Sequence, residues 1–401
     1  MALFNLRDSI KLNRDKLSNG LDIVLIPNNR VPVICVNMAY RVGSKDERFD
    51  RTGMAHLFEH LMFEGTKTVP KGEFDRLCSL AGGTNNAYTS FDLTNYYMTL
   101  PSNQLDLGLW LEADRMKNFL ITEEALINQK DVVIEEINQT VEDQPYGLWR
   151  ELMSATAYSS ESSYSWEVHG KKEHVEAVSL KDAEIFRQMY YQPDNACLII
   201  AGDIDFDTAF NKVKYHFSDI KEFHNNITRN DFKESHLIHK AYNVFEDDVP
   251  TPALFLAYHC KGFINDESNA ADILANILGV GRSSRLWKKL VRKEQIASQA
   301  GAFIDKRENT SLLIIYAFAN SPEISCNRLK ENIDYVISDF IKSPISDDEM
   351  HKAINQLSSQ FANEIQTLTG LADTVAQQAV FMNNPDRIFT MLDAYSKYEK
   401  D

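Results

Sequence analysis

The sequence lacks any pairing pattern among its cysteines. The five cysteines are an odd number and stand far apart, at Cys35, Cys78, Cys197, Cys260 and Cys326. No Cys-x-x-Cys pair occurs, so the sequence predicts neither a disulfide framework nor a zinc site built from thiolates. We expect isolated, buried thiols in a reducing compartment.

The sequence also lacks long apolar runs, and it has fewer basic residues than acidic ones. No stretch approaches the roughly 18 apolar residues that a membrane-spanning helix needs. Charged residues interrupt the N-terminus from Arg7 onward, so we expect a cytoplasmic protein, or a periplasmic one if a leader has been removed. The 42 Lys and Arg residues against 58 Asp and Glu give a net charge of −16, which argues against nucleic acid or an anionic membrane as a partner.

The chain has 401 residues, which is more than one hydrophobic core usually organises. In each half, a strand-like run leads into two helices, two further strands and two long amphipathic helices. We therefore predict an α+β fold of two tandem, similar domains, each an antiparallel-rich sheet packed with helices. The predicted domains are residues 1–218 and 241–401, joined by a polar linker at 219–240. The first half closes with a further helix and strand, and we expect the second domain to lack these two elements.

The sharpest local signal lies between Gly53 and Thr66. His56 and His60 are four residues apart, so on a helix they share one face and can converge on one metal ion. Glu59 lies on the same side of this predicted helix. Neutral imidazole suits Zn²⁺, and a carboxylate beside a metal-bound water is the natural general base. The spacing is His-x-x-Glu-His, the inverse of the commoner arrangement in zinc peptidases.

Two histidines do not complete a catalytic zinc site, which usually has three protein ligands and a water. The third ligand is expected to be a carboxylate on another element, and Glu135 and Glu136 stand on a strongly helical segment. Adjacent helical residues point about 100° apart, so only one of the two can face the metal. Gln129 lies seven residues before Glu136 and hence on the same face. The helical pattern alone leaves the choice between Glu135 and Glu136 open.

Taken together, the motifs resemble the pitrilysin/insulinase family of zinc peptidases. The likeness covers nearly the whole chain and is strongest to short members such as the mitochondrial processing peptidase β subunit and its bacterial relatives. The motifs that carry it follow one another in the family's order: Leu17–Leu21, Gly53–Thr66, Asn86–Thr94, Val132–Ile137, Tyr190–Asn195, Gly202–Asp203 and Ser284–Leu286.

The resemblance assigns roles to individual residues. His56 and His60 match the family's two zinc histidines, and Glu59 matches its general base. The family's third ligand follows the second histidine at a spacing that selects Glu136 over Glu135, which implies one Zn²⁺ per chain. Asn86 and Ala87 match the edge strand that pairs with the backbone of a peptide substrate.

Two departures from the family pattern stand out. Gln129 occupies a position where the family usually has a second glutamate, so this neighbour of the metal site carries no charge. Self-sufficient members also hold substrate with an Arg and a Tyr seven residues apart, but the aligned positions here are Val291 and Ser298. Shifting the alignment by one residue gives Arg292 and Gln299. The resemblance therefore implies a dimer in which a homologous, metal-free subunit supplies the Arg/Tyr pair, unless Arg292 or Arg285 provides other donors.

The leading functional hypothesis is a zinc metalloendopeptidase that hydrolyses peptides or unfolded polypeptides, as the catalytic subunit of a dimer. One alternative is a non-catalytic structural or assembly subunit, a role that the same fold has in respiratory complexes. Another is a chaperone-like peptide-binding protein with an incidental metal. Zinc content and hydrolysis of a quenched peptide distinguish the three.

Overall fold

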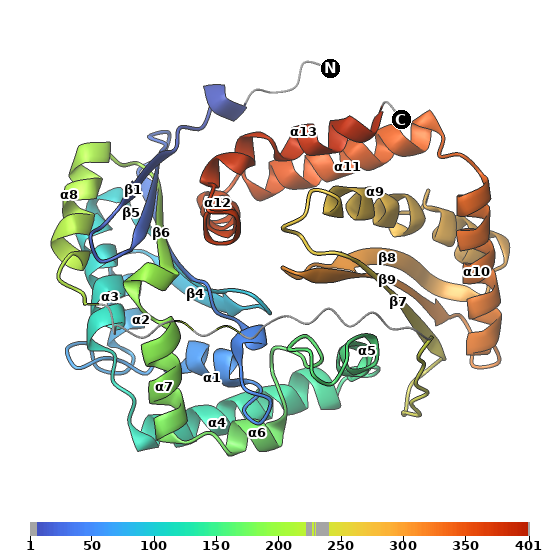
Figure 1. Ribbon diagram of the computed structural model, residues 1–401, viewed down its shortest axis with the longest axis horizontal. Coiled ribbons are helices and arrows are strands. Elements are labelled where there is room, and N and C mark those ends of the chain that lie inside the picture. Colours follow the sequence, from blue (N-terminus) through green and yellow to red (C-terminus); the bar gives the residue numbers. More distant parts are fainter. Residues whose placement is uncertain (1–5, 222–226, 228, 230–239, 400–401) are drawn as a thin grey trace. The chain divides into compact units, whose positions relative to one another are not determined.

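The computed structural model describes residues 6–221, 227, 229 and 240–399 (Figure 1). The chain forms two compact units, each assembled from three separate segments. Unit 1 comprises Met1–Ile137, Trp166–Asp231 and Asn363–Thr390, and unit 2 comprises Asn138–Ser165, Phe232–Ala362 and Met391–Asp401. The compact units are therefore interleaved along the sequence. Most of the predicted linker at 219–240 falls outside the described residues.

Unit 1 is built on a six-stranded sheet with the strand order β1-β2-β6-β3-β5-β4. Its strands are β1 (Asn13–Lys16), β2 (Asp22–Pro27), β3 (Val33–Tyr40), β4 (Thr84–Thr89), β5 (Thr94–Pro101) and β6 (Ala196–Gly202). The pair β2–β6 is parallel, whereas all the other neighbours are antiparallel. The central strands β2, β3 and β6 are buried almost along their whole length, as expected of strands covered on both faces.

Helices cover both faces of this sheet. The helices of unit 1 are α1 (Met54–Leu61), α2 (Glu73–Leu80), α3 (Leu105–Asn118), α4 (Glu123–Ile137), α6 (Lys172–Glu176), α7 (Leu180–Tyr190), α8 (Phe206–Phe217) and α12 (Leu368–Met382). Helices α3 and α8 lie on one face, and α12 lies across β6 and β3 on the other (Figure 1). Small buried side chains such as Ala372 and Ala376 let α12 approach the sheet closely.

Unit 2 contains an antiparallel three-stranded sheet with the order β7-β9-β8. Its main elements are α5 (Trp149–Ala157), β7 (Ala253–Lys261), α9 (Ser268–Gly279), β8 (Ala297–Asp305), β9 (Thr310–Ala319), α10 (Cys326–Lys342), α11 (Asp347–Glu364) and α13 (Met391–Ser396). Helix α5 packs on β7, where the rings of Trp149 and Phe255 stack 4.6 Å apart. The core of the unit gathers buried residues of α9, β8, β9 and α10.

The two units share a pattern of elements. The antiparallel order β3-β5-β4 of unit 1 recurs as β7-β9-β8 in unit 2. Each sheet also receives one helix from the other half of the sequence, α12 in unit 1 and α5 in unit 2. The predicted α+β class is confirmed.

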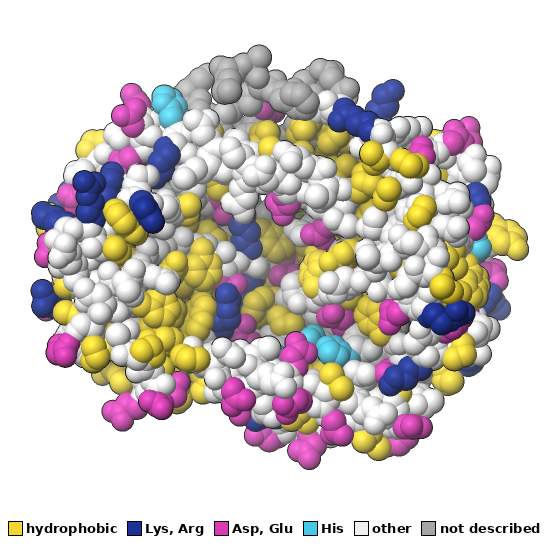
Figure 2. All heavy atoms as spheres, turned by 180° about the vertical axis from the view of Figure 1, so that it is seen from behind, with side chains coloured by type: hydrophobic (Ala, Val, Ile, Leu, Met, Phe, Trp, Pro, Cys, Tyr) yellow, Lys and Arg dark blue, Asp and Glu magenta, His cyan; other side chains and the backbone are white. Residues whose placement is uncertain are grey.

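Short helical turns join these elements. They are η1 (Leu6–Asp8), η2 (Ser44–Asp46), η3 (Ser102–Gln104), η4 (Asn138–Glu142), η5 (Pro193–Asn195), η6 (Trp287–Lys293), η7 (Pro385–Phe389) and η8 (Lys397–Glu399). Among the described residues, no helix is both long and apolar enough to cross a membrane. On the face drawn in Figure 2, Lys and Arg side chains lie singly or in small groups among acidic ones.

Candidate metal centre

Helix α1, which carries the His-x-x-Glu-His motif, begins at a tight turn. The residue before it, Gly53, has φ 87°, and a Cβ there would lie 2.5 Å from the carbonyl oxygen of His169. Instead of a side-chain cap at Gly53, the carboxylate of Glu47 accepts hydrogen bonds from the backbone N–H groups of Gly53 (2.9 Å) and Ala55 (2.7 Å). Oxygen acceptors at this position satisfy free N–H groups at the start of the helix. Burial raises the pKa of Glu47 to about 8.

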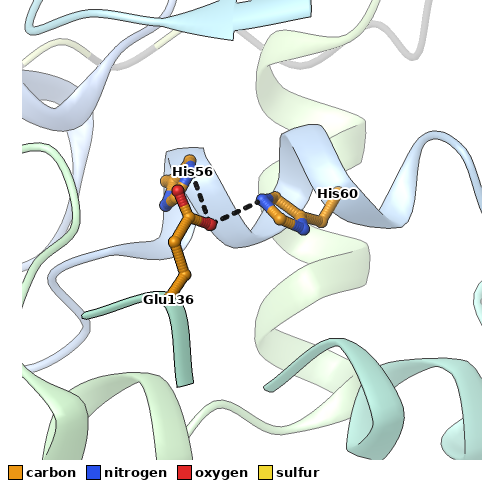
Figure 3. A group of neighbouring side chains, drawn as sticks. All are labelled: His56, His60 and Glu136. Atoms are coloured by element: carbon orange, nitrogen blue, oxygen red, sulfur yellow. Dashed lines mark ion pairs between the residues drawn. The ribbon is translucent and has the colours of Figure 1, made fainter. Parts of the chain in front are cut away.

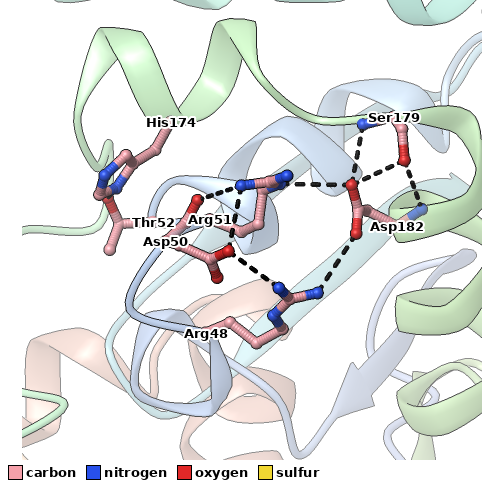
Figure 4. Close-up of polar contacts among 7 residues, drawn as sticks. All are labelled: Arg48, Asp50, Arg51, Thr52, His174, Ser179 and Asp182. Carbon is pink, nitrogen blue, oxygen red and sulfur yellow. Dashed lines mark hydrogen bonds and ion pairs between the residues drawn. The ribbon is translucent and has the colours of Figure 1, made fainter.

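The loop before α1 is anchored to α6 and α7 by side-chain hydrogen bonds (Figure 4). The Nε of Arg51 donates to Asp182 at 3.2 Å, and Asp182 in turn accepts from the hydroxyl of Ser179 at the start of α7. Thr52 Oγ1 lies 2.9 Å from Nδ1 of His174 in α6. These contacts fix the direction in which α1 leaves the loop.

Helix α4 packs against α1 and α6 and brings a carboxylate to the two histidines. Its buried residues include Val133 and Ile137, and Lys130 Nζ donates to the backbone carbonyl of Glu176 at 2.8 Å. With this side of α4 fixed, Glu136 points toward α1, whereas the neighbouring Glu135 is exposed.

The side chains of His56, His60 and Glu136 converge (Figure 3). Oε2 of Glu136 lies 3.5 Å from Nε2 of His60 and 3.9 Å from Nε2 of His56. Their possible ligand atoms all lie within 4.8 Å of one another, and no other such group of three or more His, Cys, Asp or Glu occurs among the described residues. Ligands bound tetrahedrally to zinc at ~2.0–2.1 Å stand roughly 3.3–3.5 Å apart. The three side chains therefore fit a zinc ion by their chemistry, and the 3.5 Å between Glu136 and His60 matches this spacing.

The neutral imidazole of His56 and the ionised carboxylate of Glu136 suit a cation. Burial, followed by the neighbouring His60, lowers the pKa of His56 to about 4, so its imidazole is neutral at physiological pH. The hydrogen bond from His60 lowers the pKa of Glu136 and keeps it ionised. Although burial opposes it, the hydrogen bond and charge of Glu136 raise the pKa of His60. The carboxylate thus attracts positive charge to this point.

Glu59 lies beside this group and is not a member of it. Its Oε2 accepts a hydrogen bond of 2.5 Å from Thr89 Oγ1, at the end of β4. Burial raises the pKa of Glu59 above its usual value. Thr89 therefore holds one oxygen of the Glu59 carboxylate. The sequence did not predict this contact, although Thr89 lies inside the Asn86–Thr94 motif.

Gln129 lies between His60 and the ion pair of Glu64 with Lys71. Its Oε1 lies 3.2 Å from His60 Nδ1, and its Nε2 donates to Glu64 Oε1 at 2.6 Å. Lys71 Nζ lies 2.7 Å from the same Glu64 oxygen. Because an ionised carboxylate only accepts, the amide nitrogen must face Glu64 and the amide oxygen must face His60. Nδ1 of His60 then donates to this amide oxygen, and Nε2, which faces Glu136, is the nitrogen available to a metal ion. Sequence reasoning missed Glu64 and Lys71.

Asn86 and Ala87 lie on β4, the last strand in the order of the unit 1 sheet. β4 pairs with β5 on one side, and no described strand pairs with its other side. An edge strand of this kind can accept an extended peptide as an added strand. The same strand supplies Thr89 to Glu59, so this edge and the metal group are adjacent.

Known proteins are similar to this chain in sequence and in fold. The family model described as Insulinase (Peptidase family M16) matches residues 23–165, and the model described as Peptidase M16 inactive domain matches 177–357. The zinc protease PqqE of Helicobacter pylori is 30% identical over 373 residues, covering 91% of this chain and 82% of that protein. The crystal structure of a protease from Helicobacter pylori superposes with a TM-score of 0.91 at 30% identity, covering 96% of this chain and 93% of that one.

A more distant relative is the probable mitochondrial-processing peptidase subunit beta of Arabidopsis thaliana, 23% identical over 371 residues, which are 90% of this chain and 69% of that protein. The sequence and fold matches thus place this protein in the class of peptidases. The chain belongs to the insulinase, or M16, family of peptidases, as its motifs predicted. His56, Glu59, His60 and Glu136 all fall in the segment that matches the first family model.

Proposed function

We propose that this protein is a zinc-dependent endopeptidase that hydrolyses peptides or unfolded polypeptides. The observation that carries the proposal is the convergence of His56, His60 and Glu136, with Glu59 held beside them. Two imidazoles, one carboxylate and an adjacent second carboxylate are the set that a hydrolytic zinc site requires. The names of the relatives as zinc proteases support the choice of metal.

Each side chain has a distinct part in the proposed reaction. His56, His60 and Glu136 would hold a zinc ion, which would supply Lewis acidity to a bound water and to the scissile carbonyl. Glu59 removes a proton from the attacking water and passes it to the leaving amine. Its raised pKa brings its proton affinity closer to neutral pH, as both steps need. The hydrogen bond from Thr89 orients the carboxylate so that its other oxygen can take the proton.

The edge strand β4 supports an extended substrate. Main-chain groups at Asn86 and Ala87 would pair with a peptide backbone, which gives binding with little demand on sequence. A folded protein rarely presents a free strand of the needed length, so short peptides and unfolded segments are the proposed substrates.

We also propose a partner subunit, because the positions of unit 2 that align with the family's Arg/Tyr pair are Val291 and Ser298. Val291 packs against the core of unit 2, and the hydroxyl of Ser298 lies 3.3 Å from the carbonyl oxygens of Phe318 and Ala319. Arg285 is bound to Glu349 through two hydrogen bonds of 2.8 Å. A homologous, metal-free subunit would then supply the Arg and Tyr that hold the substrate.

The test combines zinc analysis with hydrolysis of an internally quenched peptide. We expect one zinc per chain, little hydrolysis by the chain alone and strong hydrolysis after a metal-free homologue is added. Vigorous hydrolysis by the pure chain would refute the heterodimer and retain the peptidase. A chain that binds zinc and stays inactive with every homologue would favour the non-catalytic subunit instead. A site that stays empty at saturating zinc would refute the mechanism.

A further inference from the structure

Asp373 of α12 lies against the unit 1 sheet and is mostly buried. Its Oδ1 accepts hydrogen bonds from Tyr88 Oη at 2.5 Å and from Asn95 Nδ2 at 2.8 Å. Its Oδ2 accepts from Gln377 Nε2, one turn further along α12, at 3.0 Å. Three donors therefore fix this carboxylate in one orientation.

The two donors from the sheet are partners across β4 and β5. Tyr88 on β4 is directly opposite Asn95 on β5, and Tyr88 follows Ala87 in the proposed substrate-binding edge. A single carboxylate oxygen thus joins the edge strand to its neighbour and joins both strands to α12. Among the described strands, β4 pairs with β5 alone, so its outer part depends on contacts of this kind to stay in place.

Buried polar side chains lie on the strands that α12 covers, where apolar side chains would be enough to pack the helix on the sheet. Asn37 on β3 is fully buried, and neither its Oδ1 nor its Nδ2 has a hydrogen-bond partner. The Oδ1 of Asn95 is likewise buried without a partner. Apolar side chains would attach a helix to a sheet at lower desolvation cost. What a hydrogen-bonded carboxylate adds is a defined position of the helix relative to particular strand residues.

We propose that Asp373 is a positioning residue that holds the edge strand β4 in register for substrate. This role rests on the proposed function, in which β4 pairs with the peptide backbone. Asp373 does not touch the metal group, so it should affect peptide binding and leave zinc binding unchanged. The sequence gives no sign of it, because 285 positions separate Tyr88 from Asp373.

The experiment compares Asp373→Asn and Tyr88→Phe with Asp386→Asn in the full chain. Asp386 is exposed in η7, immediately after α12, so its variant removes the same charge without a buried contact. Hydrogen exchange of the β4 amides should quicken roughly tenfold in Asp373→Asn and Tyr88→Phe, as expected for the loss of about one hydrogen bond. Hydrogen exchange in β2 and β6 should be unchanged. The double variant, Asp373→Asn with Tyr88→Phe, should exchange at the same rate as Asp373→Asn, because both substitutions affect the same Tyr88–Asp373 hydrogen bond.

Activity provides the second readout. In both variants we expect the KM for a quenched peptide to rise roughly tenfold while kcat changes less than about threefold, with one zinc still bound. A purely structural role would lower the melting temperature and leave KM and β4 exchange as in Asp386→Asn, which would overturn the proposal. If Asp373→Asn does not fold, Tyr88→Phe decides alone, since it removes only a hydroxyl. If the wild type neither binds nor cleaves peptides, the proposed function fails, and β4 exchange decides whether Asp373 positions the strand.

Discussion

Replacing Gln129 with glutamate should weaken the metal site, although it restores the residue that the family usually has. The amide nitrogen of Gln129 donates to Glu64 at 2.6 Å, and Glu64 is largely buried. In Gln129→Glu, a carboxylate oxygen takes the place of this donor. Two carboxylates then meet at hydrogen-bond distance, so one must take up a proton or rotate away. Rotation removes the acceptor that now faces Nδ1 of His60.

The size of the effect follows from the geometry. Two unit charges 2.6 Å apart repel by about 6 kcal/mol at an effective dielectric constant of about 20. Rotation and the nearby Lys71 relieve most of this, so we expect the free energy of unfolding to fall by about 1–3 kcal/mol, the cost of breaking a buried hydrogen bond. Zinc affinity should fall roughly 10–100-fold, as for other losses of a partner to a metal-binding histidine.

A double variant makes the prediction specific. Glu64→Gln together with Gln129→Glu exchanges the amide and the carboxylate, so residue 64 donates and residue 129 accepts from His60. Zinc affinity, measured by competition with a chelator at constant pH, should return to within about threefold of the wild-type value. Glu64→Gln alone is the control and should change affinity little, because an amide oxygen at residue 64 still accepts from Gln129. Equal or tighter zinc binding by Gln129→Glu than by the double variant would refute the reasoning.

Three further predictions concern carboxylates of unit 1. Glu59→Gln should retain zinc, since Glu59 is outside the ligand group, and should lose ~10²–10⁴-fold in kcat; loss of zinc would show that its role is wrong. Glu136→Gln should release zinc in a chelator titration, whereas the adjacent, exposed Glu135→Gln should bind like wild type. Because burial raises the pKa of Glu47 from 4.5 to about 8, the folded state holds an extra proton between these values. Stability should therefore fall as pH rises from about 5 to 8, by up to ~1.4 kcal/mol per pH unit; pH-dependent denaturant titrations of Glu47→Gln should show a flatter profile.

Local spacing was enough to place part of the site. His56, Glu59 and His60 lie on one helix, as their spacing predicted, because helical periodicity acts over a few residues. Helical geometry alone left Glu135 and Glu136 as alternatives, and the family resemblance favoured Glu136. The structure brings Glu136 to the histidines because α4 packs on α1 with its apolar side turned inward.

The sequence pattern did not predict some of the element boundaries. Helical periodicity in the sequence runs from Glu123 to Val141, but helix α4 ends at Ile137, where the backbone passes into the wider turn of η4. Residues 284–293 also show helical periodicity in the sequence, and the structure forms the wider-turn segment η6 there, at Trp287–Lys293. Both patterns are apolar at helical spacing, and this spacing does not distinguish a tight helical turn from a wider one.

The sequence by itself determined the family, the α+β class and the residues of the metal motif, because each is encoded in short, ordered patterns. Only the tertiary structure decided which polar groups support them. The contacts Thr89–Glu59, Gln129–Glu64 and Tyr88–Asp373 join residues 30, 65 and 285 positions apart. The interleaving of the two units and the exchange of α5 and α12 belong to the same class of feature. Such contacts depend on how sheets and helices pack after they form, and no local periodicity encodes the position of a partner so far along the chain.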